Sequence, residues 1–178
     1  MDAKLSDYQT ARQALADLHA PFAGADDPLP RFRTVSPDRI PQPFRKLLVH
    51  QEHMTAILQG HYGRPVRLKV LRQRREGDCY RRQIALTLDG GRPIVEYGIV
   101  RIDLRYMPED VRKQILGRRA PLGDVLIAHD VLRQVQPRWF LRFPEGFARA
   151  DGPLYGRVGT IYVQREPAIE LLEVVTGA

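Results

Sequence analysis

An arginine lies on the apolar face of a predicted β-strand. Residues 80–88 alternate with period two, which places Arg82 on the same face as Ile84, Leu86 and Leu88. An arginine keeps its proton, so a buried one needs an anionic partner. That partner is either a carboxylate of the protein or a bound ligand. The alternation alone favours neither.

Two glutamates of the last predicted strand could supply or complement such a partner. In residues 168–175, Glu170 and Glu173 fall on opposite faces, each among apolar side chains. Whichever face covers the core, one glutamate points into it. One interpretation is a buried ion pair with Arg82, which is costly to desolvate. The other is a pocket with an arginine at one end and a carboxylate at the other, which would bind an anion bearing a distant polar group.

Metal and cofactor chemistry find little support in the sequence. His50 and His53 are three residues apart on a predicted helix, but no His-Glu-x-x-His motif and no pair of cysteines accompanies them. Neither standard glycine-rich phosphate loop occurs. We therefore expect no metal and no cofactor. The single cysteine, Cys79, excludes an internal disulfide and suits a reducing compartment.

Composition indicates a soluble globular protein. The 178 residues suffice for one domain with a sizeable core, and 43% of them are hydrophobic. No apolar run is long enough for a membrane span and the N-terminus lacks a signal core, so we expect a cytoplasmic protein without membrane association. The 28 Lys and Arg outnumber the 21 Asp and Glu. We interpret this excess as solvated strand faces rather than a nucleic-acid surface, or as a field that attracts a small anion.

The predicted elements divide the chain into two parts. Residues 1–43 hold a helix over 6–19 and a Pro-rich connection over 21–43, packed on the fold. Residues 44–178 form the main domain, in which apolar spacing from Phe44 to Leu58 predicts one helix that ends near Gly60 or Gly63. Further helices are expected over 108–117 and up to Ala128. Strands are expected at 66–72, 80–88, 94–104, 131–135, 139–143, 157–163 and 168–175, with turns at 76–78 and 89–91.

Strands joined by short turns, with helices early and in mid-chain, predict an α+β fold in a single domain. The sheet should be mainly antiparallel with flanking helices, because helices do not alternate with strands as in a parallel doubly wound fold.

Four segments occur in an order that resembles a known family. They are Leu47-Leu48 with His53-Met54-Thr55, then Arg82-Gln83-Ile84-Ala85-Leu86 with Asp89-Gly90-Gly91-Arg92-Pro93, then Ala120-Pro121-Leu122-Gly123, and finally Leu154-Tyr155-Gly156-Arg157 with Ile169-Glu170-Leu171. From Leu47 to Val175 the chain resembles the chorismate lyase family, also called chorismate pyruvate-lyase or 4-hydroxybenzoate synthase, and especially its divergent branch. His53, Gln83 and Val158 depart from the family pattern, which has Ser, Glu and Arg there.

The resemblance implies roles for particular residues. Arg82 would grip the ring carboxylate and Glu170 would face the 4-oxygen of the ring, with Glu173 as a second candidate because the alignment needs a gap of about two residues. The other substrate-binding residues implied are Met54, Thr55, Leu122, Gly123 and Arg157, the last for a second carboxylate.

The activity implied is that of a carbon–oxygen lyase. It would eliminate pyruvate from chorismate, or a close relative, to give 4-hydroxybenzoate without metal or organic cofactor. The alternative is a non-catalytic domain of the same fold that binds a small aromatic acid or anion as an effector. For either function we expect a small anionic ligand and no nucleic acid as partner. Neither function distinguishes a monomer from a homodimer.

Overall fold

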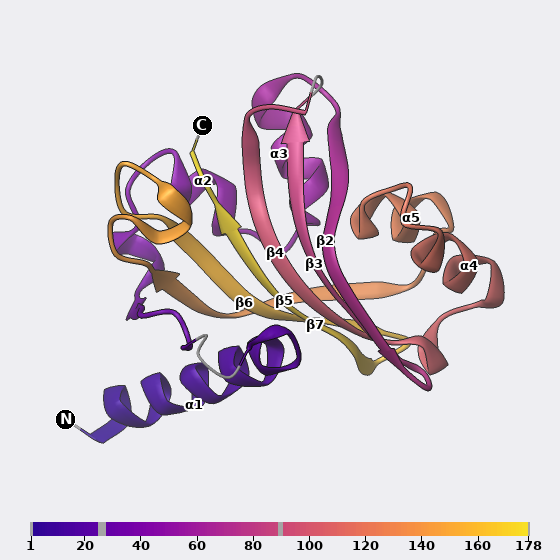
Figure 1. Cartoon of the computed structure of the whole chain (residues 1–178), viewed down its shortest axis with the longest axis horizontal. Helices are drawn as coiled ribbons and strands as arrows, with labels where there is room; N and C mark the ends of the chain where they lie inside the picture. The colour runs from indigo at the N-terminus through magenta and orange to yellow at the C-terminus, as the bar shows by residue number, and fades with distance from the viewer. Residues whose placement is uncertain (1, 25–27, 89–90, 178) are drawn as a thin grey trace.

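The computed structural model describes residues 2–24, 28–88 and 91–177 and contains one seven-stranded antiparallel sheet (Figure 1). Its strand order is β1-β5-β6-β7-β4-β3-β2. The strands are β1 (Arg33–Val35), β2 (Val66–Glu76), β3 (Cys79–Leu88), β4 (Ile94–Asp103), β5 (Arg133–Arg142), β6 (Tyr155–Val163) and β7 (Glu166–Val175). The α-helices are α1 (Asp2–His19), α2 (Phe44–Leu48), α3 (Met54–Tyr62), α4 (Glu109–Gly117) and α5 (Leu122–Ala128). The predicted α+β class with a mainly antiparallel sheet is confirmed.

The helices cover the sheet from both sides. The apolar residues of α2, α3, α4 and α5 pack against one face of the sheet, in two clusters that lie side by side. Helix α1 packs on the opposite face, where Leu15 and Leu18 join the same cluster as Trp139 and Phe143. The Trp139 indole also donates a hydrogen bond to Asp7 of α1 at 2.7 Å. The face under α2 to α5 carries Arg82, and we call it the helix-covered face.

The helix predicted from Phe44 to Gly60 or Gly63 is wrong in one respect: it is broken into α2 and α3. Val49 leaves the helical region with φ −91° and ψ 77°. The carbonyl groups of Leu48 and His50 accept hydrogen bonds from Arg157 of β6, at 3.2 and 2.9 Å, so the break has partners elsewhere in the fold. The apolar residues of the two helices still face the same way, because Leu47 of α2 and Leu58 of α3 pack in one cluster.

Three other stretches sharpen or alter the expected elements. The strands predicted at 131–135 and 139–143 form one strand, β5, whose register shifts between Pro137 and Trp139, where proline offers no N–H to the ladder. The connection over 21–43 contains β1, which extends the sheet by pairing with β5. The predicted turn at 89–91 falls mostly on residues 89–90, which lie outside the described residues.

Each strand places alternate residues on the helix-covered face, and two neighbouring rows of that face frame the site. Arg82 pairs with Val100, and Val100 with Leu171. In the next row, Gly98 lies between Ile84 and Glu173. None of the described helices combines the length and hydropathy needed to span a bilayer.

Candidate ligand-binding pocket

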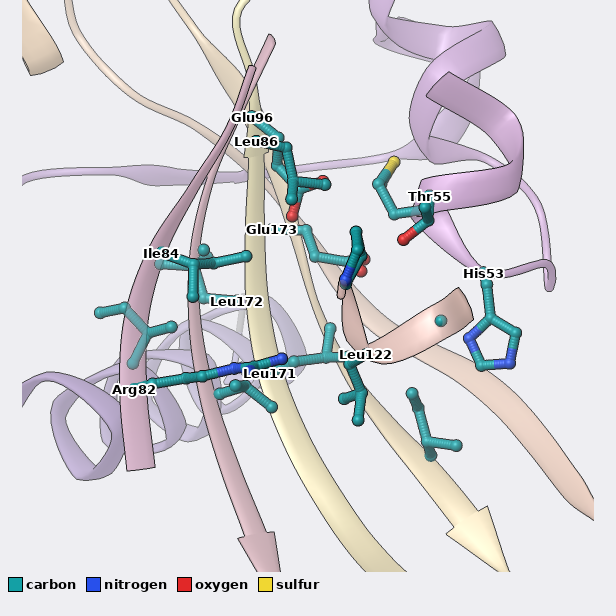
Figure 2. A pocket seen from close by; sticks show the side chains of 17 residues that line it. His53, Thr55, Arg82, Ile84, Leu86, Glu96, Leu122, Leu171, Leu172 and Glu173 are labelled. Atoms are coloured by element: carbon teal, nitrogen blue, oxygen red, sulfur yellow. The ribbon is translucent and has the colours of Figure 1, made fainter. Parts of the chain in front are cut away.

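A pocket lies between the helix-covered face of the sheet and the first turns of α3 and α5 (Figure 2). The space between these elements, counted together with its open mouth, is about 500 Å³. The lining residues are His53, Met54, Thr55, Arg82, Ile84, Leu86, Glu96, Gly98, Ile99, Val100, Pro121, Leu122, Gly123, Ile161, Leu171, Leu172 and Glu173. Most of them are apolar, with a few ionisable groups among them.

Arg82 enters the pocket from β3 and is only 1% exposed. Its Nε and Nη1 atoms are buried and have no hydrogen-bond partner in the described part of the chain. The Tyr80 hydroxyl lies near Arg82 and tends to raise its pKa. This hydroxyl donates its own hydrogen to Gln73 at 2.9 Å. Burial lowers the pKa of Arg82, although an arginine remains a cation at physiological pH. Arg82 therefore presents a desolvated positive charge with unused donors, a state that an anion would stabilise.

Arg157 is equally buried but has a different environment. Its Nε donates to Glu173 at 2.6 Å, and its Nη2 donates to the Glu52 carbonyl at 3.2 Å. Its Nη1 bonds the carbonyls of Leu48 and His50. Arg157 is not among the described residues that line the pocket. The structure thus does not place it to meet a second ligand carboxylate: its donors hold Glu173 and the segment between α2 and α3.

The two candidate glutamates of β7 lie on opposite faces, as alternation requires. Glu173 is on the pocket face and lines the pocket, where it is ion-paired with Arg157. Glu170 is on the other face, where it lies 3.4 Å from the half-exposed Arg101. The expectation that Glu170 faces the ligand is corrected: the inward carboxylate is that of Glu173.

A third glutamate, Glu96 of β4, also faces the pocket and was not predicted. It is 3% exposed, and its Oε2 atom is buried with no hydrogen-bond partner among the residues described. Burial, and next the charge of Glu173, raise its pKa well above the usual range, with Arg157 opposing. The signal was present in the sequence, because Glu96 alternates onto the same strand face as Val100 and Ile102.

Gly98 leaves the floor of the pocket open. It lies on β4 between Ile84 of β3 and Glu173 of β7. A Cβ atom at this position would lie 3.0 Å from Ile84 Cγ1 and 3.3 Å from Glu96 Oε1. A side chain there would crowd the space between Arg82 and the two glutamates. The glycine thus keeps the pocket free.

The helix side of the pocket brings together the four residues expected there. Met54 and Thr55 begin α3, and Leu122 and Gly123 begin α5. A Cβ atom on Gly123 would lie 3.0 Å from Thr55 Oγ1, so the close approach of the two helices depends on this glycine. Helix α3 has no side-chain cap, which leaves its first-turn N–H groups open to an acceptor.

His53 precedes α3 at the same wall and is 7% exposed. Arg133 donates from Nε to His53 Nε2, so the ring proton of the neutral histidine is on Nδ1. Burial lowers the pKa of His53 to about 4, with the charges of Arg133 and Arg157 adding to the effect. His53 is therefore neutral at physiological pH and contributes no cation to the pocket. Figure 2 shows it apart from the two glutamates.

Within the described residues, no group of three or more His, Cys, Asp or Glu side chains is arranged to hold a metal ion. The expectation that the site works without metal or cofactor stays a prediction.

Comparison with known proteins yields little. No protein-family model matches the sequence, and no curated protein matches it. Among solved structures, the chain is similar to PhnF from Mycobacterium smegmatis, with a TM-score of 0.48 and 14% identity over 95% of this chain and 80% of that one. A likeness at this level assigns neither a family nor a function. The functional argument rests on the pocket.

Proposed function

We propose that the pocket binds a small carboxylic acid built on an apolar ring, with its carboxylate on Arg82. The observation that carries this proposal is the unused pair of donors on a guanidinium that is 1% exposed. The walls beside it are aliphatic, formed by Ile84, Val100, Leu122 and Leu171. A flat ring with one carboxylate would match both the walls and the charge.

For the chemistry, we propose cofactor-free elimination of pyruvate from chorismate, or a close relative, to give 4-hydroxybenzoate. Arg82 and Glu173 are two strands and two residues apart, which separates their Cα atoms by about 12 Å, and both side chains line the same pocket. In this reaction the ether bond between the ring carbon and the enolpyruvyl oxygen breaks, and the ring loses a proton and becomes aromatic. The released enolpyruvate takes up a proton and becomes pyruvate. The protein then needs to hold a reactive conformer and to stabilise charge on the leaving group.

The glutamate that faces the ring oxygen, expected from the sequence to be Glu170, is Glu96 in this proposal. Glu173 is paired with Arg157, whereas Glu96 is buried, forms no ion pair with any described residue and has a raised pKa. A protonated Glu96 could donate a hydrogen bond to the ring oxygen opposite the carboxylate, next to the ether bond that breaks.

One observation favours a second function, in which the acid is bound without being cleaved. Arg82 is the only lysine or arginine among the described lining residues. His53, which also lines the pocket, is neutral, and the donors of Arg157 are directed to Glu173 and to backbone carbonyl groups. Chorismate carries two carboxylates, so one of them would lack a charged partner here. A monocarboxylate fits the charge more simply, as expected of a domain that senses an aromatic acid.

The experiment mixes purified protein with chorismate and follows pyruvate release by a coupled assay, while calorimetry measures binding of chorismate and 4-hydroxybenzoate. Arg82→Met is compared with Arg101→Met, which removes a half-exposed arginine on the other face. Pyruvate release that only Arg82→Met abolishes would support the lyase. Binding of intact ligand, lost in Arg82→Met alone, would support the sensing role. An Arg82→Met protein that binds and reacts as the wild type does would contradict both.

A further inference from the structure

The end of the pocket away from Arg82 holds two carboxyl groups that lie close together. Glu96 of β4 pairs with Val175 of β7, and Glu173 of β7 pairs with Gly98 of β4. The two glutamates are thus diagonal neighbours on one face, with Cα atoms about 7–8 Å apart. Figure 2 shows both side chains directed into the same space.

Arg157 forms an ion pair with only one of these two glutamates, Glu173. Arg157 donates its Nε–H to Glu173 Oε2, and its remaining hydrogen bonds go to carbonyl groups and His50. Glu96 has no ion pair within the described residues, and its Oε2 atom is shielded from solvent. Two carboxylates so placed repel one another, so one of them keeps a proton. Because Glu173 is the glutamate that pairs with Arg157, the proton belongs on Glu96.

We propose that Glu96 is a specificity-determining residue, which hydrogen-bonds a neutral hydroxyl or carbonyl oxygen of the ligand and, together with Glu173, excludes a second anionic group from this end. The inference rests on the proposed function, because it places the ligand carboxylate on Arg82. It narrows the ligand class to ring carboxylic acids with a neutral oxygen, rather than a second carboxylate, opposite the ring carboxylate. A carboxylate at that position would face Glu173, and the described part of the pocket offers no further cation beside it, so this contact selects against such ligands.

Calorimetry with two probes of similar shape tests the selectivity. Wild-type protein should bind 4-hydroxybenzoate at least about tenfold more tightly than terephthalate, which has a second carboxylate in place of the hydroxyl. Glu96→Gln keeps a neutral hydrogen-bonding group of the same size and should hold the affinity for 4-hydroxybenzoate within about threefold. Glu96→Leu removes the hydrogen bond and should weaken that affinity about tenfold.

A ligand-free measurement tests the proton itself. The infrared difference spectrum between wild type and Glu96→Gln at neutral pH should show the C=O stretch of a protonated carboxylic acid in the wild type. A spectrum with carboxylate bands alone would overturn the inference.

The two proposals fail in different ways. If 4-hydroxybenzoate binds through Arg82 but terephthalate binds as well, and Glu96→Leu changes nothing, the selectivity inference is overturned while the proposed function stands. If 4-hydroxybenzoate does not bind at all, the proposed function fails, and the infrared band still decides whether Glu96 holds the proton.

Discussion

Arg82 and Arg157 occupy similar positions and do opposite things. Both are 1% exposed, and both project from central strands onto the helix-covered face of the sheet. Arg157 has a carboxylate and three carbonyl groups as partners, whereas two nitrogens of Arg82 have none among the described residues. Burial of a charge therefore does not reveal its role. The two arginines differ in whether their N–H groups have hydrogen-bond partners in the protein.

The difference follows from what each arginine joins. Arg157 links β7, the end of α2 and the segment before α3, so the irregular backbone between the helices depends on it. Arg82 lies in a regular ladder, where β3 pairs on both sides without help from the side chain. A residue that breaks a local rule without structural compensation is typical of a functional site.

The largest effect is expected from removing the arginine that has partners. Arg157→Met should lower the free energy of unfolding by about 3–5 kcal/mol, because it leaves Glu173 buried beside Glu96 without a cation. Urea denaturation would measure this, with Arg101→Met as the matched control. Equal midpoints for the two variants would show that Arg157 does not support the fold.

Arg82→Met should change stability in the other direction. Replacing an unpaired buried cation with an apolar side chain should leave the free energy of unfolding unchanged or raise it by about 2 kcal/mol. The same urea titration gives the answer. A loss comparable to that of Arg157→Met would mean that Arg82 has a structural anionic partner, which would remove the contrast between the two arginines.

A smaller effect, linked to pH, is expected from His53 in the wall of the pocket. The folded-state pKa of His53, about 4, is below the ordinary value of 6.5. The stability gained from neutral His53 is therefore present above pH 6.5 and is lost as the pH falls toward 4.

Between pH 7 and pH 4.5, wild-type protein should lose about 1–2 kcal/mol more than His53→Gln, which cannot titrate but still offers Arg133 an acceptor. Unfolding curves at the two pH values measure the difference. Parallel losses in the two proteins would show that His53 is not held neutral.

The smallest effect is expected on the far side of the sheet. Glu170→Gln removes a pair with Arg101 in which both side chains are about one-third or more exposed, so the free energy of unfolding should move by less than about 0.5 kcal/mol. The affinity for 4-hydroxybenzoate should not change. A clear loss of affinity in calorimetry would return Glu170 to the site.

Alternation along single strands was enough to place Arg82 on the buried face and to separate Glu170 from Glu173. It could not tell which face of β7 carries the pocket, because that depends on which strands flank β7 and on the opening at Gly98. Glu96 obeys the same alternation and could have been found by testing every charged residue of each predicted strand.

The role of Arg157 could not be read from the sequence in the same way. Three of its partners are carbonyl groups at a helix break more than 100 residues earlier in the chain. No local sequence pattern predicts contacts between segments so far apart. The break itself was missed because the apolar spacing continues across it.

The central claim is that Arg82 binds the carboxylate of the ligand. Calorimetry of 4-hydroxybenzoate and its neutral amide, 4-hydroxybenzamide, against wild type and Arg82→Met forms a double-mutant cycle. We expect a coupling of at least about 1.5 kcal/mol, because a charged hydrogen bond to the carboxylate is present in one corner of the cycle alone. If the acid and the amide lose the same affinity on Arg82→Met, the coupling is zero and Arg82 does not bind the carboxylate.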